Sequence, residues 1–480
     1  DGRVIVARLG DPLDDVLAAG GLVIGEGDRG PELRYGPLRF PLTPGTEQLD
    51  VAEAIERQHY RLQSWRTPDR NVRRFFTIDD LVAVRVEDSE VADVVDTIPA
   101  RLADHPAFAG VRVDHVDGLA KPGAYLAGLR RRIGDHRWLV VEKILAPGEV
   151  LAPSWPVDGT TGYEHIRVSE HTFLDPAAEE SLTRLWSDLT GDGRLFSEIE
   201  DQSRREVLAG GLRPDLDRLV RLVVHESDHV MSGDRVRDAI VELTVGVHRY
   251  RTYLPDDAAS VAALDGAHRR ALAARDDLTT TVDAVADLIR SSPTVATRWE
   301  QLTSPVMAKG AEDRAFYRYL RLPALCEVGG APGDFAKSVD DFHRHHAEVQ
   351  AAMPTTMIAG TTHDTKRSEG VRARALALAD VADEWSEVVR QWLADHDHHG
   401  LDAATVLLAL HTAATAWPID ADRMSEYLVK SAREAELHTS WTGPDDDYET
   451  SLHCLAADLE DELLHDVTDS ALGDIVMRTL

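Results

Sequence analysis

Two short apolar runs, each ending on an acidic residue, constrain the fold of this chain more than any other feature. The runs are Gly110–Asp114 and Trp138–Glu142, and a helical segment from Gly123 to Ile133, opened by Pro122, lies between them. A strand, a helix and a second strand within about 30 residues form one βαβ repeat, and such repeats build parallel sheets and barrels. The sequence therefore predicts an α/β protein, which we expect to be a TIM-type (β/α)8 barrel.

The position of the next acidic run predicts a large insertion in this barrel. A third strand-like run, Thr355–Thr361, precedes His363 and Asp364, and Asp364 lies 222 residues after Glu142. Barrel strands normally follow one another at intervals of roughly 30 residues. From about residue 180 to 345 apolar residues recur at three- and four-residue spacing, which is typical of helices. We predict a loop-rich insertion at 1–50, a barrel segment at 51–178, an inserted helical domain at 179–345, a barrel segment at 346–372 and a helical segment at 373–480.

Local patterns predict three further elements before the first acidic run. Spacing favours a helix from about Thr46 to Trp65. Residues Arg73 to Glu87 alternate and are rich in β-branched and aromatic side chains, so they are predicted to form a strand. Ser89 is the expected N-cap of a helix from about Glu90 to Ala103.

Composition excludes several classes of partner. Asp and Glu number 84 against 52 Lys and Arg, for a formal net charge of −32, whereas nucleic-acid binding needs basic surface to displace counterions. No apolar run approaches the roughly 20 residues that cross a bilayer. The two cysteines, Cys326 and Cys454, have no CxxC spacing. We therefore expect no nucleic-acid or membrane partner, and a reducing, cytoplasmic location.

The three acids at the ends of the predicted strands form a candidate catalytic set. Active sites of (β/α) barrels lie at the carboxyl ends of the strands. Arg112 shares a strand face with Asp114 and favours its ionised form, whereas the apolar residues before Glu142 raise the pKa expected of a general acid. One ionised and one protonated carboxyl group are the requirement of retaining glycoside chemistry. Strand-end acids also serve as helix caps or solvated groups, so spacing alone leaves the chemistry open.

Several motifs narrow these alternatives by resemblance. Residues 110–119 (GVRVDHVDGL), 140–143 (VVEK) and 362–366 (THDTK) resemble the second, third and fourth conserved regions of the α-amylase superfamily. Within that superfamily, further stretches are similar to the maltooligosyltrehalose synthase family. They are Gln58–Tyr60, Arg73–Phe76, Trp155–Tyr163, Met307–Gly310, Phe316–Tyr319, Glu327–Gly330 and His363–Arg367.

The resemblance assigns a role to each matching residue. It implies that Asp114 is the nucleophile, Glu142 the acid/base, and Asp364 the carboxylate that stabilises the oxocarbenium-like transition state. The residues that it implies for substrate binding are Arg112, which orients Asp114, His115, His363 in the −1 subsite, Lys309 and Lys366 at the reducing-end glucose, and Trp155 and Tyr163 as stacking surfaces.

The implied reaction is an intramolecular transglucosylation. The reducing-end α-1,4 bond of a maltooligosaccharide becomes an α-1,1 bond, as in a (1→4)-α-D-glucan 1-α-D-glucosylmutase of trehalose biosynthesis. The resemblance implies no metal and no organic cofactor, and a maltooligosyltrehalose trehalohydrolase as the next enzyme. The superfamily's first conserved region and final barrel strand have no counterpart here, and the chain opens on Asp1 without a Met or signal peptide. We therefore expect an incomplete barrel, with early and last strands supplied by other segments of the polypeptide or by separate chains.

Three alternative functions remain open at this point. An ordinary retaining α-glucan hydrolase or transglucosylase would share the three carboxylates, although Lys309 and Lys366 favour the synthase. A non-catalytic glucan-binding protein would have no need to retain them. A zinc metallopeptidase is the alternative from another class, because His225, Glu226 and His229 match HExxH. No third ligand follows at the usual spacing, so a solvated helix face is the favoured interpretation of that match.

Overall fold

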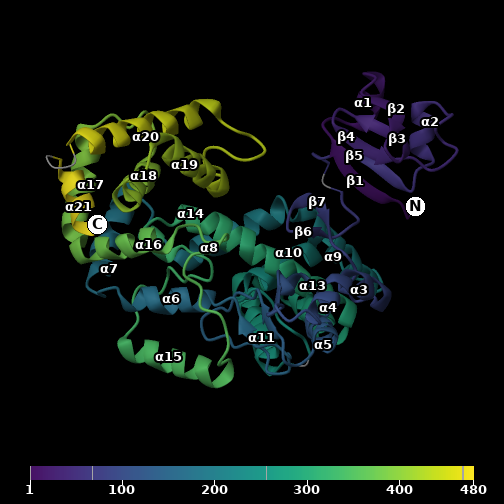
Figure 1. Cartoon of the computed structure of the whole chain (residues 1–480), viewed down its shortest axis with the longest axis horizontal. Helices are drawn as coiled ribbons and strands as arrows, with labels where there is room; N and C mark the ends of the chain where they lie inside the picture. Colours follow the sequence, from purple (N-terminus) through teal and green to yellow (C-terminus); the bar gives the residue numbers. More distant parts are fainter. Residues whose placement is uncertain (1, 68, 256, 467–469) are drawn as a thin grey trace.

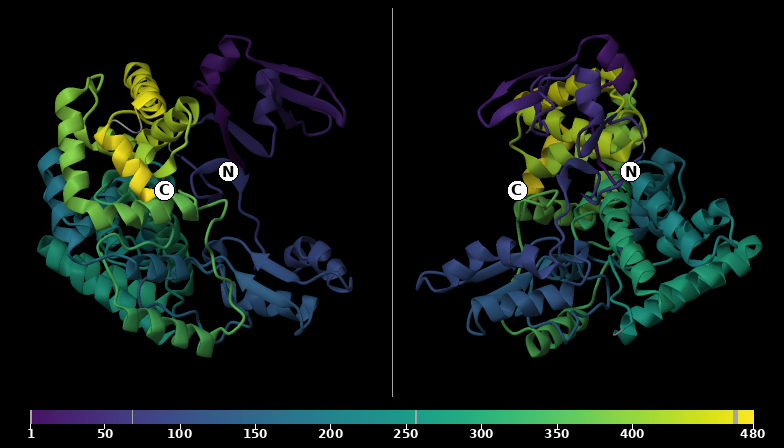
Figure 2. Two further views of the ribbon diagram at one scale, coloured as in Figure 1. Left: turned by 60° about the vertical axis from the view of Figure 1, so that its left-hand side comes forward. Right: turned by 90° about the vertical axis from the view of Figure 1, so that its right-hand side faces the viewer.

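The computed structural model describes residues 2–67, 69–255, 257–466 and 470–480. Figure 1 shows a mixed α/β molecule in which helices predominate. A small N-terminal unit of strands stands to one side, and the helices of the last part of the chain gather on the other (Figures 1 and 2). A parallel sheet and the helices that follow it make up the rest. None of the described helices combines the length and apolarity that crossing a membrane requires.

The N-terminal unit is more regular than the predicted loop-rich insertion. Leu9, Leu33 and Leu62 are buried in its core, and Gly and Pro residues occupy the turns. Its first and last strands are parallel neighbours, and its other three strands form an antiparallel sheet. The elements are β1 (Val4–Leu9), α1 (Leu13–Ala18), β2 (Leu22–Gly27), β3 (Gly30–Tyr35), β4 (Leu38–Pro41), α2 (Val51–Glu56) and β5 (Tyr60–Ser64).

Of the helix predicted from Thr46 to Trp65, only α2 (Val51–Glu56) forms. In β5 Leu62 and Ser64 are buried and Arg61 is exposed. This alternation has the period of two that a strand requires. Pairing with β1 thus decides the conformation of residues whose spacing also suits a helix.

The predicted βαβ repeat is present. Strands β8 (Gly110–Val113), β9 (Trp138–Val141) and β10 (Gly159–Thr160) form a parallel sheet in the order β10-β9-β8. Helix α5 (Pro122–Ile133) connects β8 to β9, and its buried face includes Leu126, Leu129 and Ile133. Val113 pairs with Val141, so the acidic residues that follow them emerge at the same edge of the sheet.

The third predicted strand, Thr355–Thr361, does not form. The segment runs beside β10 with long hydrogen bonds, from Met357 N to Thr160 O (3.3 Å) and from Ala359 N to Gly162 O (3.4 Å). Gly162 has φ of +86°, and a Cβ atom there would lie 2.2 Å from the Met357 carbonyl oxygen. Only glycine therefore permits this close approach, which sets the course of the chain toward Asp364.

The elements predicted between Arg73 and Ala103 are each divided in two. Residues 73–87 form a hairpin of β6 (Arg74–Phe75) and β7 (Ile78–Val82), because Phe76 turns the chain with a left-handed φ of 51°. The following helix is two helices, α3 (Ser89–Val95) and α4 (Thr97–Ala103). Asp88, rather than Ser89, is the N-cap of α3.

Helices dominate from residue 163 to 352, as the sequence predicts. Buried residues of α8 to α13, among them Trp299, Leu243 and Val285, form one apolar core. The elements are η1 (Val116–Gly118), which precedes this region, then α6 (Tyr163–Thr172), α7 (Ala178–Thr190), α8 (Phe196–Ala209), α9 (Arg213–Glu226), α10 (Gly233–Val245), α11 (Ala258–Ala274), η2 (Asp276–Leu278), α12 (Thr279–Ser291), α13 (Pro293–Val306), the π-helix η3 (Met307–Ala315), α14 (Phe316–Arg318), η4 (Pro323–Leu325) and α15 (Val339–Ala352).

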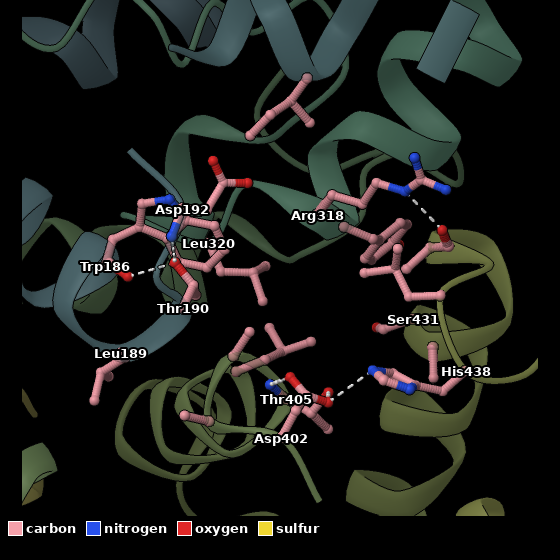
Figure 3. A pocket seen from close by; sticks show the side chains of 18 of the residues that line it. Trp186, Leu189, Thr190, Asp192, Arg318, Leu320, Asp402, Thr405, Ser431 and His438 are labelled. Carbon is pink, nitrogen blue, oxygen red and sulfur yellow. Dashed lines mark hydrogen bonds and ion pairs between the residues drawn. The ribbon is translucent and has the colours of Figure 1, made fainter. Parts of the chain in front are cut away.

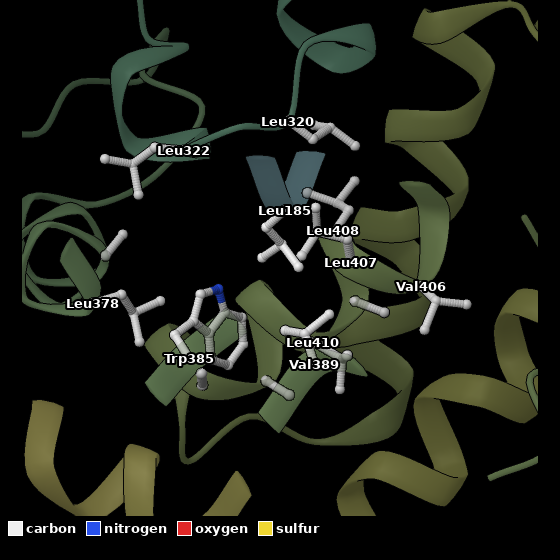
Figure 4. Packing of buried hydrophobic residues seen from close by; sticks show 14 of the residues in the cluster. Leu185, Leu320, Leu322, Leu378, Trp385, Val389, Val406, Leu407, Leu408 and Leu410 are labelled. Atoms are coloured by element: carbon white, nitrogen blue, oxygen red, sulfur yellow. The ribbon is translucent and has the colours of Figure 1, made fainter. Parts of the chain in front are cut away.

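A second apolar core joins α7 to the C-terminal helices. Figure 4 shows its centre, where Trp385, Val389, Leu407 and Leu410 meet Leu185 of α7. The elements are α16 (Glu369–Ala377), η5 (Leu378–Val381), α17 (Ala382–Asp395), α18 (Ala403–Ala416), α19 (Ala421–Ala435), α20 (Asp446–Asp466) and α21 (Ala471–Thr479). Helix α18 is buried along most of its length, which accounts for its nearly continuous apolar sequence.

Truncating the centre of this core should destabilise the protein. We expect Leu410→Ala to lower the free energy of unfolding by about 2–5 kcal/mol, because the side chain is fully buried and its removal leaves a cavity. Leu464→Ala is the matched control, since Leu464 is 60% exposed. Urea unfolding followed by circular dichroism compares the two; similar shifts for both variants would contradict the assignment of this core.

Candidate active site

Asp114, Glu142 and Asp364 line one cavity of about 290 Å³. Its lining also includes Lys309 and Lys366. The structure therefore brings together side chains from the ends of β8 and β9, from the π-helix and from the loop after residue 361, although they are distant in sequence.

The backbone around Asp114 is shaped to place donors and acids at the sheet edge. Arg112 Nη1 lies 2.6 Å from Asp114 Oδ1. His115 has a left-handed φ of 44°, an uncommon conformation for a residue with a side chain. This turn directs the His115 N–H to Glu142 Oε2, at 2.8 Å. The His115 ring packs against Phe75 and Phe76, with centroids 5.1 and 4.7 Å away.

Glu142 has the electrostatic setting of a general acid. Burial raises the pKa of its carboxyl group to about 7, and the charges of Asp114 and Asp117 add to that rise. The hydrogen bond from the His115 N–H opposes it. A carboxyl group with a pKa near neutrality can donate a proton and take one back.

A buried ion cluster lies directly behind the two acids. Lys143 Nζ is 3.1 Å from Asp117 Oδ2 and 3.2 Å from Glu149 Oε1, and all three side chains are almost fully buried. Lys143 is the neighbour of Glu142, and successive residues of a strand point to opposite faces. Its positive charge therefore compensates Asp117 and Glu149.

Asp364 is held by its own loop. Tyr163 Oη lies 2.9 Å from Thr362 Oγ1 and donates to Asp364 Oδ2 at 3.5 Å, and the Asp364 N–H donates to Thr362 Oγ1 at 3.2 Å. His363 Nε2 lies 2.9 Å from Asp364 Oδ2, with 72% of the histidine side chain exposed.

The two predicted lysines share one carboxylate. Lys309 Nζ lies 2.6 Å and Lys366 Nζ 3.4 Å from Asp313, while Lys366 also stands 5.1 Å above the Tyr317 ring. Although burial opposes it, the two lysines lower the pKa of Asp313. This arrangement leaves ammonium donors along one wall of the cavity.

A π-helix positions this wall. Residues Met307–Ala315 place Lys309, Glu312 and Asp313 in the cavity lining. π-helices are rare and frequently occur at functional sites. The spacing of apolar residues does not predict this π-helix. The only sequence signals were Pro305 inside the preceding helix and the motif at 307–310.

Other contacts at the site were not predicted as functional. Glu327 accepts hydrogen bonds from the backbone N–H groups of Lys366 (2.7 Å) and Arg367 (3.0 Å) and is almost fully buried. Glu312 accepts one from the Gly329 N–H at 2.9 Å, and burial raises the pKa of its carboxyl group to about 7. Glu327 belongs to a motif named from the sequence and Glu312 does not, and the partners of both lie on other segments.

Two predicted stacking residues do not line the cavity. Trp155 is buried and packs edge-on against Tyr253, with centroids 4.9 Å apart, in a core with Val116 and Val141. Tyr163 is 1% exposed, and only its hydroxyl group reaches the Asp364 loop. In this structure both aromatic rings are packing residues.

The HExxH match does not form a metal site. Helix α9 ends at Glu226, and His229 has a left-handed φ of 59°, so the two histidines do not share a helical face. Among the residues described here, no group of three His, Cys, Asp or Glu side chains is placed to hold a metal ion. The structure thus does not favour the metallopeptidase alternative.

Another cavity, of about 300 Å³, lies among α7, α8, α18 and α19 (Figure 3). Several of its polar groups bind one another: Asp402 Oδ2 lies 3.1 Å from both Tyr448 Oη and His438 Nε2, and Thr405 Oγ1 lies 2.8 Å from Tyr448 Oη. None of the predicted site residues lines it. It is therefore a separate feature from the carboxylate cavity.

Comparison with known proteins supports the motif-based resemblance. No protein-family model matches the chain. A Mycobacterium tuberculosis protein, provisionally named as a maltooligosyl trehalose synthase, is 34% identical over 463 residues, which are 94% of this chain and 58% of that protein. The maltooligosyltrehalose synthase of Arthrobacter ramosus superposes with a TM-score of 0.88 at 36% identity, over 99% of this chain and 60% of that one.

A more distant solved structure agrees in fold. It is a Sulfolobus tokodaii chain described as a hypothetical maltooligosyl trehalose synthase, with a TM-score of 0.82 at 24% identity, covering all of this chain and 63% of that one. The matches confirm the resemblance to these synthases along nearly the whole chain. The chain spans about 60% of the length of the relatives it matches.

The raised pKa of Glu142 predicts a pH-dependent stability difference. Because burial raises the pKa in the folded protein from 4.5 to about 7, ionised Glu142 disfavours folding. The stability that the protonated Glu142 side chain provides is fully present below pH 4.5, and it is lost as the pH rises through 7 and the group ionises. Glu142→Gln should gain stability relative to the unchanged protein across this window, by up to about 3 kcal/mol.

The measurement is the difference in free energy of unfolding between the two proteins at pH 4.5 and pH 8. Glu53→Gln is the control, because Glu53 is exposed and should show a nearly constant difference. A constant difference for Glu142→Gln as well would contradict the raised pKa.

Proposed function

We propose that this chain, which is similar to maltooligosyltrehalose synthases along nearly its whole length, carries the catalytic site of an intramolecular transglucosylase. The substrate is a maltooligosaccharide, and the reaction converts its reducing-end α-1,4 bond to α-1,1. One observation carries the proposal: Asp114, Glu142 and Asp364 line a single cavity together with Lys309 and Lys366.

In the first step Glu142 protonates the glycosidic oxygen of the last bond while Asp114 attacks the anomeric carbon. The bond to the terminal glucose breaks, and a covalent β-glucosyl ester of Asp114 forms. The Arg112 guanidinium, 2.6 Å from Asp114, favours the ionised nucleophile. Asp364 stabilises the positive charge that develops on the sugar ring.

In the second step the released glucose stays in the cavity and presents its anomeric hydroxyl group. Glu142, now ionised, takes the proton of that hydroxyl group, whose oxygen attacks the anomeric carbon of the glucosyl ester and displaces the Asp114 carboxylate. Two inversions give net retention and an α-1,1 bond. Glu142 works in both directions because its pKa of about 7 lies near neutral pH.

Retention of glucose separates this reaction from hydrolysis. Lys309 and Lys366 offer N–H donors to sugar oxygens, and Asp313 fixes both ammonium groups through contacts of 2.6 and 3.4 Å. A held glucose has a large effective concentration compared with water, so it is the favoured acceptor. The chemistry uses proton transfer and a carboxylate nucleophile and calls on no metal or organic cofactor.

The fold supports the same proposal. The parallel strands β8, β9 and β10, with acids after the first two, are consistent with an amylase-type (β/α)8 barrel interrupted by a helical domain. We place the limits of that domain at 179 and 345. The α-1,1 product is the substrate expected for a trehalohydrolase, which would release trehalose.

The test is incubation with maltopentaose at neutral pH without added metal. Reducing ends should decrease and α-1,1 signals should appear in NMR spectra, with little free glucose. Asp114→Asn should lower the rate by about 10⁴-fold or more, because an amide cannot form the ester. Asp422→Asn, an exposed change on α19, is the matched control. An increase in reducing ends would instead identify an α-glucan hydrolase, and no reaction would contradict both.

Removing one of the two lysines in the cavity wall should change the ratio of α-1,1 product to free glucose. We expect Lys309→Met to lower α-1,1 product formation and raise the proportion of free glucose by roughly tenfold or more, because a charged hydrogen bond to the retained glucose is lost. Lys366 still compensates Asp313 in this variant. Equal decreases in both products would indicate that Lys309 does not act on the glucose.

A further inference from the structure

Two neighbouring cavities outside the carboxylate site share an arginine-rich wall. Their volumes are about 280 and 290 Å³, and Arg73, Arg218, Arg298 and Gln301 line both. They lie where the segment around β6 and β7 meets α9 and α13. None of the three predicted catalytic acids is part of either lining.

Two of the three arginines in this shared wall, Arg73 and Arg298, form no ion pair with a carboxylate in the described part of the chain. Within the described part of the chain, Arg73 has no side-chain hydrogen bond or ion pair, and Arg298 donates only to Gln301 Oε1, at 2.9 Å. Arg218 lies 2.7 Å from Asp215, which also binds Arg74 at 3.2 Å. Arg73 and Arg298 thus line both cavities without an ion pair to a carboxylate, and Glu87 in the first cavity is the acidic group whose charge acts on Arg73.

The acidic groups near this wall are already engaged. Asp215 is shared by two arginines, and Glu87 stands 3.8 Å from Arg85, which lines the first cavity as well. Burial, together with the positive charges of Arg298, Arg251 and Arg218, lowers the pKa of Arg73 to about 10, while the charge of Glu87 opposes this shift. The positive charge on the partly buried Arg73 and Arg218 costs free energy, which a bound anion would offset.

We propose that these cavities bind a small molecule bearing a phosphate dianion. A guanidinium group is a planar fork of donors that matches phosphate oxygens, and a dianion balances the charges of Arg73 and Arg298. Apolar groups of Leu119, Leu219 and Leu222 line the remaining walls. The combined space exceeds that of phosphate alone, so a phosphate monoester with a compact neutral group fits best.

Isothermal titration calorimetry on the whole chain tests the proposal with inorganic phosphate, glycerol 2-phosphate and malonate, at constant ionic strength. We expect saturable 1:1 binding of phosphate and tighter binding of the ester. Binding of phosphate more tightly than its ester would make the free ion the ligand and overturn the monoester assignment. Tighter binding of malonate than of either would overturn the phosphate class.

Arg298→Gln should weaken phosphate binding about tenfold or more, since it removes a charge-assisted hydrogen-bond donor. The phosphate affinity of Arg298→Lys should lie between those of the unchanged protein and Arg298→Gln, because lysine keeps the charge but lacks the planar fork of donors. Arg423→Gln is the control of equal charge change, at an exposed arginine on α19. If circular dichroism shows that Arg298→Gln is unfolded, Arg73→Gln replaces it. Absence of saturable binding, or equal affinities of the variant and the control, would overturn the site.

Discussion

The burial of Lys143 between Asp117 and Glu149 is the interaction on which the candidate active site depends. A buried ammonium group is costly unless carboxylates compensate it, and these two lie 3.1 and 3.2 Å away. Asp117 follows β8, and Lys143 follows β9, so the cluster joins the carboxyl ends of both strands. The ammonium group of Lys143, the residue next to Glu142, is paired with Asp117 and Glu149. Among the described residues, the hydrogen bond that the Glu142 carboxylate accepts comes from the His115 N–H. Burial raises the pKa of Glu142, and the charges of Asp114 and Asp117 contribute to the same rise.

The parallel sheet and the acids at its edge could be predicted from the sequence, whereas most contacts between distant segments could not. The βαβ repeat was predictable because apolar runs, a Pro-initiated helix and terminal acids are local signals. The Arg112–Asp114 pair followed from the period of a strand. The partners of Glu312 and Glu327 were not predictable, since they depend on segments that meet only in the folded chain.

Where local prediction failed, tertiary contacts decided the outcome. Residues 60–64 have helical spacing but pair with β1, and Thr355–Thr361 lies beside β10 without forming a strand. Trp155 stands in a loop motif that suggested a sugar-stacking surface, yet Tyr253 and the apolar residues around it bury its ring. In each case the residue pattern was compatible with two environments, and packing selected one of them.

The π-helix at Met307–Ala315 has a consequence for how this site can change. A π-turn corresponds to an α-helix that has accepted an additional residue, and each residue of an α-helix rotates the following ones by about 100°. Loss of one residue here would swing Lys309, Glu312 and Asp313 to new directions together. Point substitutions alter single groups of the wall, whereas a one-residue deletion reorients all of them. Insertions and deletions in this helix are therefore a direct route to a differently shaped cavity, because they move the whole wall in one step.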